Sequence, residues 1–254
     1  AGRTEVFECI MGLRPEHTGD ILLEGKKMEI HSISEQIERG FALVPEDRQR
    51  EGLVQTMSIL KNISLSSIKK YVKGFLLDDK LEGRRADEQI KDIHIKVADK
   101  NLPILSLSGG NQQKVVIGKG LLTNPKILLL DEPTAGMDAL SRRQMWNLLR
   151  KLNEKNLTIL LTTHYMEEAQ SLCNRVALMD HGKLEEVSTP SALIESLGAY
   201  AVDEMTADGT QNHYFHTRQE AIRYLEQLTG QASLRETTLE DVFVERAGKH
   251  LISK

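Results

Sequence analysis

The chain contains an apolar run that ends in two adjacent carboxylates, Ile127-Leu128-Leu129-Leu130-Asp131-Glu132-Pro133. Such a run is typical of a strand that is buried on both faces of a parallel sheet and delivers polar residues at its carboxyl end. Strand patterns over residues 41–44, 158–162 and 175–179 alternate with helical patterns over 141–153 and 166–173. His181-Gly182 marks a turn to a final strand over 183–187. The alternation predicts an α/β fold in which helices cover both faces of a parallel sheet.

A second motif lies one helix before this strand, where residues 107–114 read Leu-Ser-Gly-Gly-Asn-Gln-Gln-Lys. A hydroxyl and unobstructed backbone N–H groups at a helix start form an anion site. The Asp-Glu pair suits a metal ion and a water molecule beside a nucleotide phosphate. Alone, a Ser-Gly-Gly triplet is more often a turn, and Asp131 and Glu132 could be a solvated strand end. Together, the two motifs indicate hydrolysis of a nucleoside triphosphate.

At these residues the chain resembles the ATP-binding subunits of ABC transporters, and further motifs follow in the order of that family. Val44-Pro45-Glu46 resembles the loop that couples to the membrane partner, although the family usually has Gln in place of Glu46. Asp138 matches the loop that contacts the second subunit, and His164 matches the switch histidine. The resemblance implies a P-loop NTPase core with a parallel sheet, a helical subdomain and a small C-terminal α+β accessory region.

The resemblance is divided between two subfamilies. From residue 1 to about 134, the chain resembles the second ATPase half of tandem sugar-importer subunits, with Gly2-Arg3-Thr4-Glu5 and Val44-Pro45-Glu46-Asp47-Arg48 among its marks. From about 138 to 254, Thr163-His164-Tyr165-Met166-Glu167-Glu168-Ala169 resembles single-domain ATPases of drug and polysaccharide exporters. Importer-type second halves usually lack the histidine. The transported substrate, and import as against export, therefore stay open.

The chain begins inside a motif. A phosphate-binding loop reads G-x-x-x-x-G-K-[ST] after a strand, and Ala1-Gly2-Arg3-Thr4 matches only its last part. We therefore expect an N-terminally truncated loop without the preceding strand. Arg3 stands where the family has Lys. It keeps the positive charge, but a planar guanidinium changes the geometry around a phosphate. Without the other motifs, an ordinary helix start would be the better interpretation.

The sequence pattern, together with the family resemblance, divides the chain into four parts. They are a partial nucleotide-binding core (1–45), a helical signature subdomain (46–107), the rest of the core (108–187) and a C-terminal accessory or regulatory subdomain (188–254).

Local signals predict several helices within these parts. Ser58 is expected to cap a helix over residues 59–66, and a second, acidic and basic helix is expected over 86–98. Near the end of the chain, Thr238-x-x-Asp241 resembles a capping box that opens a helix.

Composition excludes several classes of protein. The formal net charge of -4 gives no sign of the basic surface that nucleic-acid-binding proteins carry. Cys9 and Cys173 form no metal-binding or redox spacing, so a reduced cytosolic setting is the default. No apolar stretch approaches the ~20 residues that span a bilayer. Any membrane association must therefore come through a partner, and the family resemblance implies a peripheral protein at the cytoplasmic face of the membrane.

The resemblance also implies a role for each matching residue. ATP and Mg²⁺ would be the cofactors, and a transmembrane permease and a second ABC ATPase domain, identical or different, would be the partners. The nucleotide-binding residues would be Gly2, Arg3, Thr4, Glu46 and Asp131, with Thr4 and Asp131 also holding the metal. Glu132 and His164 would be catalytic. Contacts with the facing subunit would come from Ser108, Gly109, Gly110, Gln112 and Asp138.

Several residues have simpler interpretations. His164 could be a structural histidine, and Glu46 only a loop carboxylate. His213 and His216 are expected on a surface strand, because further metal ligands are lacking nearby. Trp146 is expected to pack in a core.

Two other functions stay open. A DNA-maintenance ATPase also carries a Ser-Gly-Gly signature, but the long heptad repeats of such proteins are absent between residues 46 and 107. A non-hydrolysing interaction module would keep only the signature side active.

Overall fold

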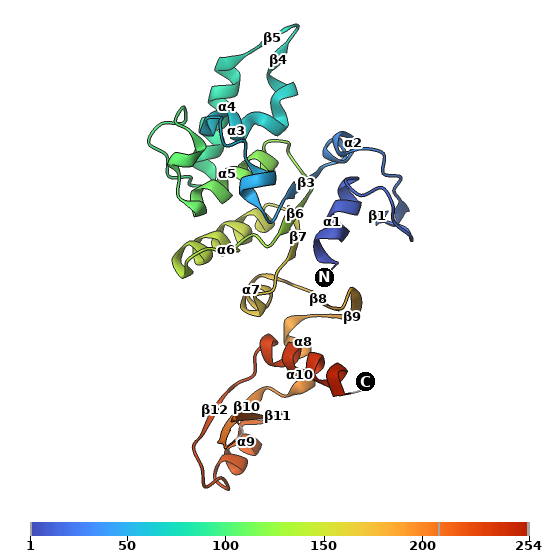
Figure 1. Cartoon of the computed structure of the whole chain (residues 1–254), viewed down its shortest axis with the longest axis vertical. Coiled ribbons are helices and arrows are strands. Elements are labelled where there is room, and N and C mark those ends of the chain that lie inside the picture. The colour runs from blue at the N-terminus through green and yellow to red at the C-terminus, as the bar shows by residue number, and fades with distance from the viewer. Residues whose placement is uncertain (1, 208, 253–254) are drawn as a thin grey trace. The chain divides into compact units, whose positions relative to one another are not determined.

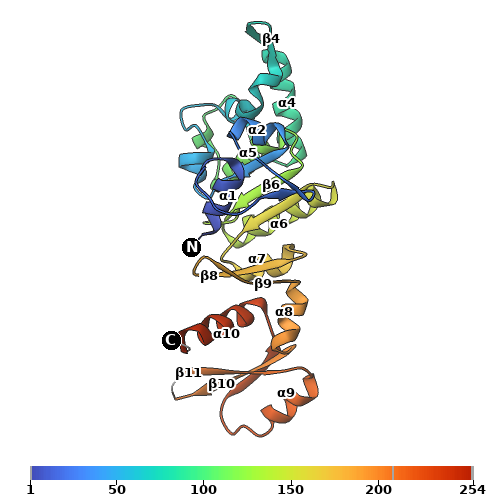
Figure 2. The ribbon, with the colours of Figure 1, turned by 90° about the vertical axis from the view of Figure 1, so that its right-hand side faces the viewer.

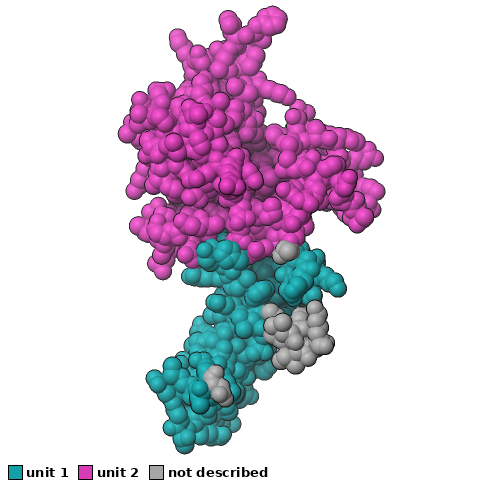
Figure 3. Space-filling model, viewed as in Figure 1, with its two compact units in different colours: residues 1, 164–254 teal, residues 2–163 magenta. Residues whose placement is uncertain are grey.

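The structure is a computed structural model that describes residues 2–207 and 209–252. The chain forms two compact units, one of residues 2–163 and one that begins at residue 164 (Figure 3). The sequence places the start of an accessory region at residue 188, whereas the contacts divide the chain 24 residues earlier. The finer division into four parts remains a prediction.

A parallel sheet lies at the centre of the first unit (Figure 1). Its strands are β3 (Phe41–Val44), β6 (Ile127–Asp131) and β7 (Thr158–Thr162), in the order β3-β6-β7. All neighbouring strands are parallel, and Asp131 lies opposite Thr162. The three predicted strands and the parallel α/β core are therefore confirmed.

Alternate residues of these strands pack on helices at the two faces of the sheet. One face packs on helix α1 (Arg3–Met11) through a buried cluster of Phe7, Met11, Phe41 and Leu129. On the other face, Gly120 of helix α5 (Gly109–Leu121) lies close to Ala42 and Leu128. The absence of a side chain at Gly120 lets this helix approach the sheet closely. The expectation of a sheet covered on both faces is confirmed.

Three further helices belong to the sheet region or its flank. Helix α2 (Ile33–Glu38) follows α1 and contacts β3. Helix α6 (Ala139–Glu154) packs on β7, and Trp146 on this helix is buried, as expected. A short π-helical turn, η1 (Arg48–Gly52), follows β3 and contacts α5.

The helical part of the first unit lies between η1 and α5. Helix α3 (Ile59–Ser64) begins after Ser58, whose hydroxyl accepts a hydrogen bond from the backbone N–H of Lys61 at 3.2 Å, which confirms the predicted cap. The chain continues as 3₁₀-helical turns over η2 (Leu65–Tyr71) and, before α5, η3 (Ile104–Ser106).

The predicted helix over residues 86–98 is wrong in its bounds. Helix α4 spans Asp79–Asp92. It begins earlier because the carboxylate of Asp78 accepts a hydrogen bond from the backbone N–H of Leu81 at 2.9 Å, which is an N-cap. It ends before His94, whose φ of 54° lies in the left-handed region that stops helices.

Gly118 provides a test of packing in this helical part. A Cβ atom at Gly118 would lie 2.9 Å from Cδ1 of Ile63 and 3.0 Å from Cδ1 of Ile93. We expect Gly118→Ala to lower the free energy of unfolding by about 1–3 kcal/mol, because buried apolar groups would have to move. Gly83→Ala is the control, since its Cβ would meet its nearest neighbour at 3.4 Å. Equal stability of both variants in denaturant unfolding would contradict the expectation.

Two small antiparallel hairpins also belong to the first unit. One joins β1 (Leu22–Leu23) to β2 (Lys26–Lys27), and the other joins β4 (Val72–Lys73) to β5 (Leu76–Leu77). The second hairpin projects beyond α3 and α4 in both ribbon views (Figures 1 and 2).

The second unit begins with helix α7 (Met166–Leu172) and a hairpin of β8 (Val176–Asp180) and β9 (Lys183–Ser188). The sequence pattern assigned the strand near residues 175–179 to the parallel sheet, and this is wrong. The strand β8 pairs with β9 in antiparallel fashion. The reason is the turn at His181 and Gly182, whose φ angles of 45° and 78° reverse the chain at once.

An antiparallel sheet forms the rest of the second unit. Strand β10 (Tyr200–Thr206) lies between β11 (Gly209–Phe215) and β12 (Ala232–Glu236). Helix α9 (Arg218–Leu225) packs on all three strands (Figure 2). Helices α8 (Pro190–Leu197) and α10 (Leu239–Ile252) share a buried cluster with α7, which contains Ala169, Val176, Leu178, Leu193, Leu239 and Val242.

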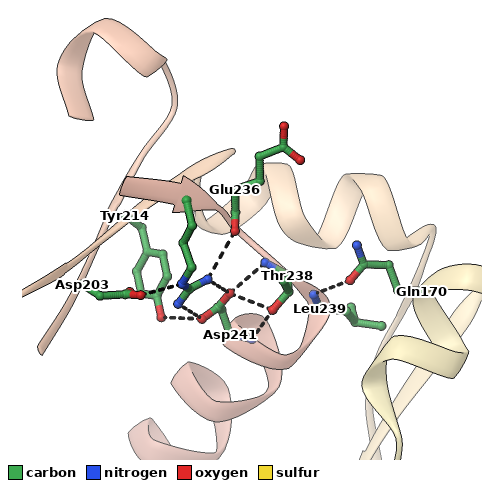
Figure 4. A network of polar contacts seen from close by, with 8 residues as sticks. Gln170, Asp203, Tyr214, Glu236, Thr238, Leu239 and Asp241 are labelled. Atoms are coloured by element: carbon green, nitrogen blue, oxygen red, sulfur yellow. Dashed lines mark hydrogen bonds and ion pairs between the residues drawn. The ribbon is translucent and has the colours of Figure 1, made fainter. Parts of the chain in front are cut away.

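The predicted capping box at the start of α10 is confirmed. The backbone N–H of Thr238 donates to the carboxylate of Asp241 at 2.7 Å, and the N–H of Asp241 donates to the Thr238 hydroxyl at 3.4 Å. Asp241 also accepts two hydrogen bonds of 2.7 Å from Arg235, which in turn donates a hydrogen bond to Asp203 (Figure 4).

None of the helices in the described residues combines the length and the apolar character needed to cross a membrane.

Candidate functional site

A cleft of about 530 Å³ opens in the first unit where strands β3 and β6 end. Three residues of the predicted nucleotide site line it, namely Thr4, Glu46 and Asp131. Thr4 comes from the first turn of α1, Glu46 from the loop after β3, and Asp131 from the last position of β6. The fold therefore brings together residues that are far apart in the sequence, at the edge of a parallel sheet where ligands commonly bind.

The lining of this cleft is acidic. Among its residues, five carry a carboxylate and one carries a guanidinium, namely Glu8, Glu46, Asp47, Glu51, Asp131 and Arg48. Such a lining would repel a polyphosphate and attract a cation, and a cation bound to the polyphosphate would lessen the repulsion.

Asp131 is held firmly at the floor of the site. It is 2% exposed, and the hydroxyl of Thr162 donates a hydrogen bond to its carboxylate. The two residues are neighbours because β6 and β7 pair in register. A carboxylate fixed in this way is preorganised to receive a ligand.

Glu132 adopts an unusual backbone conformation directly after the strand. Its φ is 46°, in the left-handed region that costs a non-glycine residue about 1–3 kcal/mol. Its backbone N–H donates to the carbonyl of Thr162 at 3.2 Å. This conformation turns the chain at the end of β6, so that Glu132 does not continue the direction of the strand.

Arg3 contacts Glu132 directly, a contact that the sequence analysis did not find. Nη2 of Arg3 lies 3.2 Å from Oε1 of Glu132, and Nη1 donates to the carbonyl of Thr163 at 2.7 Å. The side chain of Glu132 is only 5% exposed. The planar fork of arginine can serve two acceptors at once, which a single ammonium does less well. The arginine at this position therefore ties the start of α1 to the catalytic candidate.

The signature motif stands at the N-terminus of α5. Ser108 occupies the N-cap position, but its hydroxyl forms no cap to the backbone and instead accepts a hydrogen bond from Asn111 at 3.1 Å. A Cβ on Gly109 would lie 2.9 Å from Nη2 of Arg48, which also lines the cleft. In the sequence, Arg48 is only one of the residues that carry the family resemblance. Arg48 is far from residues 108–110 in the sequence, so only the fold brings it next to the signature.

Gln112 of the signature and Asp138 of the predicted dimer loop have local roles in the structure. Gln112 is 6% exposed, and its side-chain amide donates to the carbonyl of Leu107 at 3.1 Å. Asp138 caps α6 by accepting from the backbone N–H of Ser141 at 2.9 Å and from its hydroxyl at 2.6 Å. Hydrogen bonding from Ser141 lowers the pKa of Asp138. Gly2, at the N-cap of α1, has a φ of 96° that favours glycine.

His164 belongs to the second unit. Its ring lies 4.1 Å, centroid to centroid, from the ring of Tyr165. Its assignment to the catalytic site therefore remains a prediction. His213 is on strand β11, where its ring lies within hydrogen-bonding distance of Glu204 and Tyr224. The described residues contain no group of three or more His, Cys, Asp or Glu side chains arranged for a metal.

Comparison with known proteins agrees with this fold and motif order. A family model described as "ABC transporter" matches residues 1–135. The xylose import ATP-binding protein XylG of Escherichia coli strain K12 is 38% identical over 187 residues, which are 73% of this chain and 36% of that protein. XylG of Shigella flexneri shows the same values. The chain thus spans about a third of the length of these relatives.

Two solved structures of ATP-binding cassettes are similar to this chain. The dimeric, post-hydrolysis ATP-binding cassette MJ0796, bound to ADP and phosphate, superposes with a TM-score of 0.63 at 26% identity, over 74% of this chain and 80% of that one. CbiO1 from Clostridium perfringens, part of the cbiONQ transporter complex, has a TM-score of 0.63 at 25% identity, over 76% and 74% of the two chains. The fold is the mixed α/β fold of ATP-binding cassettes. The chain belongs to the ABC transporter family, within its ATP-binding component.

Proposed function

We propose that this chain is the ATP-binding and ATP-hydrolysing part of an ABC transporter and powers solute transport through a membrane partner. The cleft that joins Thr4, Glu46 and Asp131, with Glu132 next in the chain, carries the proposal. The similarity to xylose-import ATPases favours a sugar as the transported solute. Uptake of a panel of pentoses by vesicles that contain this chain and its permease would test that choice.

The residues of the cleft fit a magnesium ion as well as a nucleotide. Thr4 and Asp131 offer a hydroxyl and a carboxylate, the oxygen ligands that Mg²⁺ prefers, and such sites commonly use one or two protein ligands together with substrate phosphates. When bound, the ion would neutralise charge that develops on the phosphates. The acidic lining supports a requirement for it.

The protein groups would then divide the chemistry as follows. Glu132 orients and polarises the attacking water, and His164 contributes a polar contact to the γ-phosphate. Arg3 gives up its ion pair with Glu132 and turns its charge toward the phosphates. Release from Arg3 would leave the carboxylate of Glu132 available to accept a hydrogen bond from the attacking water.

The signature would serve a facing subunit. Ser108 leaves the first backbone N–H groups of α5 without a side-chain cap, and such groups bind anions. The similar cassette MJ0796 is described as a dimer, and CbiO1 as part of a transporter complex. We infer by analogy a second ATPase domain, a permease, and a peripheral position at the cytoplasmic membrane face. Glu46 would couple the nucleotide to the permease.

One observation favours a second candidate, an interaction module that binds nucleotide without hydrolysing it. Glu132, the predicted catalytic carboxylate, is engaged in an ion pair with Arg3. If ATP does not break this pair, only the signature side would remain active.

Calorimetric titration of the whole chain with ATP, with and without magnesium, tests the proposal. We expect magnesium to raise the affinity about tenfold or more, since relief of ~1.4 kcal/mol of repulsion is enough for that factor. Asp131→Asn should reduce the magnesium dependence. Asp79→Asn, at a side chain that is 81% exposed and outside the cleft, should leave it unchanged. Absence of ATP binding would refute the proposed function, and equal affinities would refute the metal site.

A further inference from the structure

The hairpin of β4 and β5 carries large apolar side chains that no part of its unit covers. Phe75 is fully exposed, with a relative exposure of 105%, Leu76 is 77% exposed and Val72 is 48% exposed. In the space-filling view, side chains stand out from the first unit at this end (Figure 3). Removal of such groups from water is favourable, so a contact that buries this tip would be stabilising.

Hydrogen bonds and a buried tyrosine anchor the base of the hairpin. At its base, the backbone N–H of Asp78 donates to the carbonyl of Tyr71 at 2.8 Å. Tyr71 is 3% exposed, and its hydroxyl lies 2.8 Å from that of Ser67. Gly74 opens the two-residue turn with a φ of 62°, a conformation that glycine adopts without strain. The tip is therefore presented on an anchored base.

Positive charge prevails at the tip, where three lysines stand against the carboxylates of Asp78 and Asp79 at its base. Residues 68–77 read Ile-Lys-Lys-Tyr-Val-Lys-Gly-Phe-Leu-Leu, with three lysines and no acidic residue, in a chain whose net charge is -4. Lys69 is exposed, and the side chain of Lys73 is 74% exposed, although it pairs with Asp78 at 2.8 Å. Lys70 is held by the carbonyls of Leu122 and Thr123. A hairpin tip that combines exposed apolar side chains with neighbouring lysines matches an anionic lipid surface.

The size of the tip favours lipid over a protein partner. The side chains of Phe75 and Leu76 offer on the order of 300 Å², whereas a stable protein interface takes about 800 Å² from each partner. A bilayer needs no complementary pocket, because apolar side chains enter the boundary between headgroups and acyl chains. We propose that the β4–β5 hairpin docks on an anionic bilayer, with Phe75 and Leu76 inserted and Lys69 and Lys73 facing lipid phosphates.

Fluorescence of the whole chain carrying Phe75→Trp tests this proposal. The native tryptophan, Trp146, is 6% exposed and gives a constant background. With vesicles of phosphatidylcholine and phosphatidylglycerol, we expect a blue shift of the emission that weakens with salt and is much smaller with phosphatidylcholine alone. Leu22→Trp is the matched control, because Leu22 is 62% exposed on the β1–β2 hairpin, where Asp20 pairs with Lys27 at 2.6 Å. It should show no shift.

Vesicle sedimentation gives the second measurement. The double substitution Phe75→Ser and Leu76→Ser should lower the vesicle partition coefficient about tenfold or more. Lys69→Gln and Lys73→Gln should each lower it roughly fivefold at low salt. No shift with anionic vesicles, or an equal shift in the Leu22→Trp control, would overturn the proposal. So would a shift that needs a membrane protein in the vesicles, or one explained by self-association without lipid.

Discussion

Glu132→Gln is expected to lower ATP hydrolysis about 10²–10³-fold while ATP binding changes little. Loss of one preorganised polar group in an active site has this effect on rate. The amide keeps the shape of the carboxylate and a hydrogen-bond acceptor for Arg3, which lies 3.2 Å from Glu132. It cannot accept a proton from the attacking water. The loss should therefore fall on the chemical step.

Single-turnover hydrolysis by the whole chain, with an excess of enzyme over ATP, measures that step. Glu5→Gln is the matched control, because Glu5 is an exposed carboxylate on the same helix as Arg3 and outside the cleft lining. Its rate should equal that of the wild type. A Glu132→Gln variant with the wild-type rate would assign catalysis to another group. No hydrolysis even in the wild type would favour the non-hydrolysing module.

The core of the fold could be predicted from the sequence because its signals are local. The apolar run before Asp131 determines the strand by itself, since few other structures accept such a run between polar segments. The cap at Ser58 and the box at Thr238 are likewise readable from neighbouring residues. Strand β8 was assigned to the wrong sheet, because a period of two cannot distinguish a parallel from an antiparallel partner.

The site could be predicted only in part. The order of motifs assigned Thr4, Glu46 and Asp131 to nucleotide binding, and the structure places all three around one cleft. Their role in nucleotide binding remains a prediction. Two features of the site depend on the packing of segments that are distant in the sequence, for which the sequence carries no periodic signal. They are the ion pair of Arg3 with Glu132 and the proximity of Arg48 to Gly109. The hairpin of β4 and β5 was not predicted because its strands have two residues each, too short for a pattern.

Arg235→Ala is expected to lower the stability of the second unit by about 2–3 kcal/mol. Arg235 donates two hydrogen bonds of 2.7 Å to Asp241 and one of 2.7 Å to Asp203. The side chain of Asp241 is 8% exposed, so the substitution would leave a buried carboxylate without its cation. The cost stays below the 3–5 kcal/mol of a fully buried pair, because Arg235 is 34% exposed and Thr238 still donates to Asp241.

Thermal unfolding by circular dichroism, together with hydrogen exchange of the amides in β10 and β12, measures this change where it arises. Arg223→Ala is the control, since Arg223 is exposed on α9, and surface substitutions usually stay within about 0.5 kcal/mol. Equal stability of the two variants would show that the network contributes little.

The pH dependence of stability follows from the same network. Burial acts to raise the pKa of Asp241, but the hydrogen bonds from Arg235 and Thr238 outweigh it and lower the pKa from 3.8 to about 2. A depressed pKa means that the unfolded chain binds the proton more readily, so the contribution is complete above about pH 4 and is lost as the pH falls toward 2. The wild type should lose about 2 kcal/mol through this group over that interval. Arg235→Ala has already lost most of this stabilisation, so its stability should fall less steeply with acid, and parallel pH profiles would contradict the assignment.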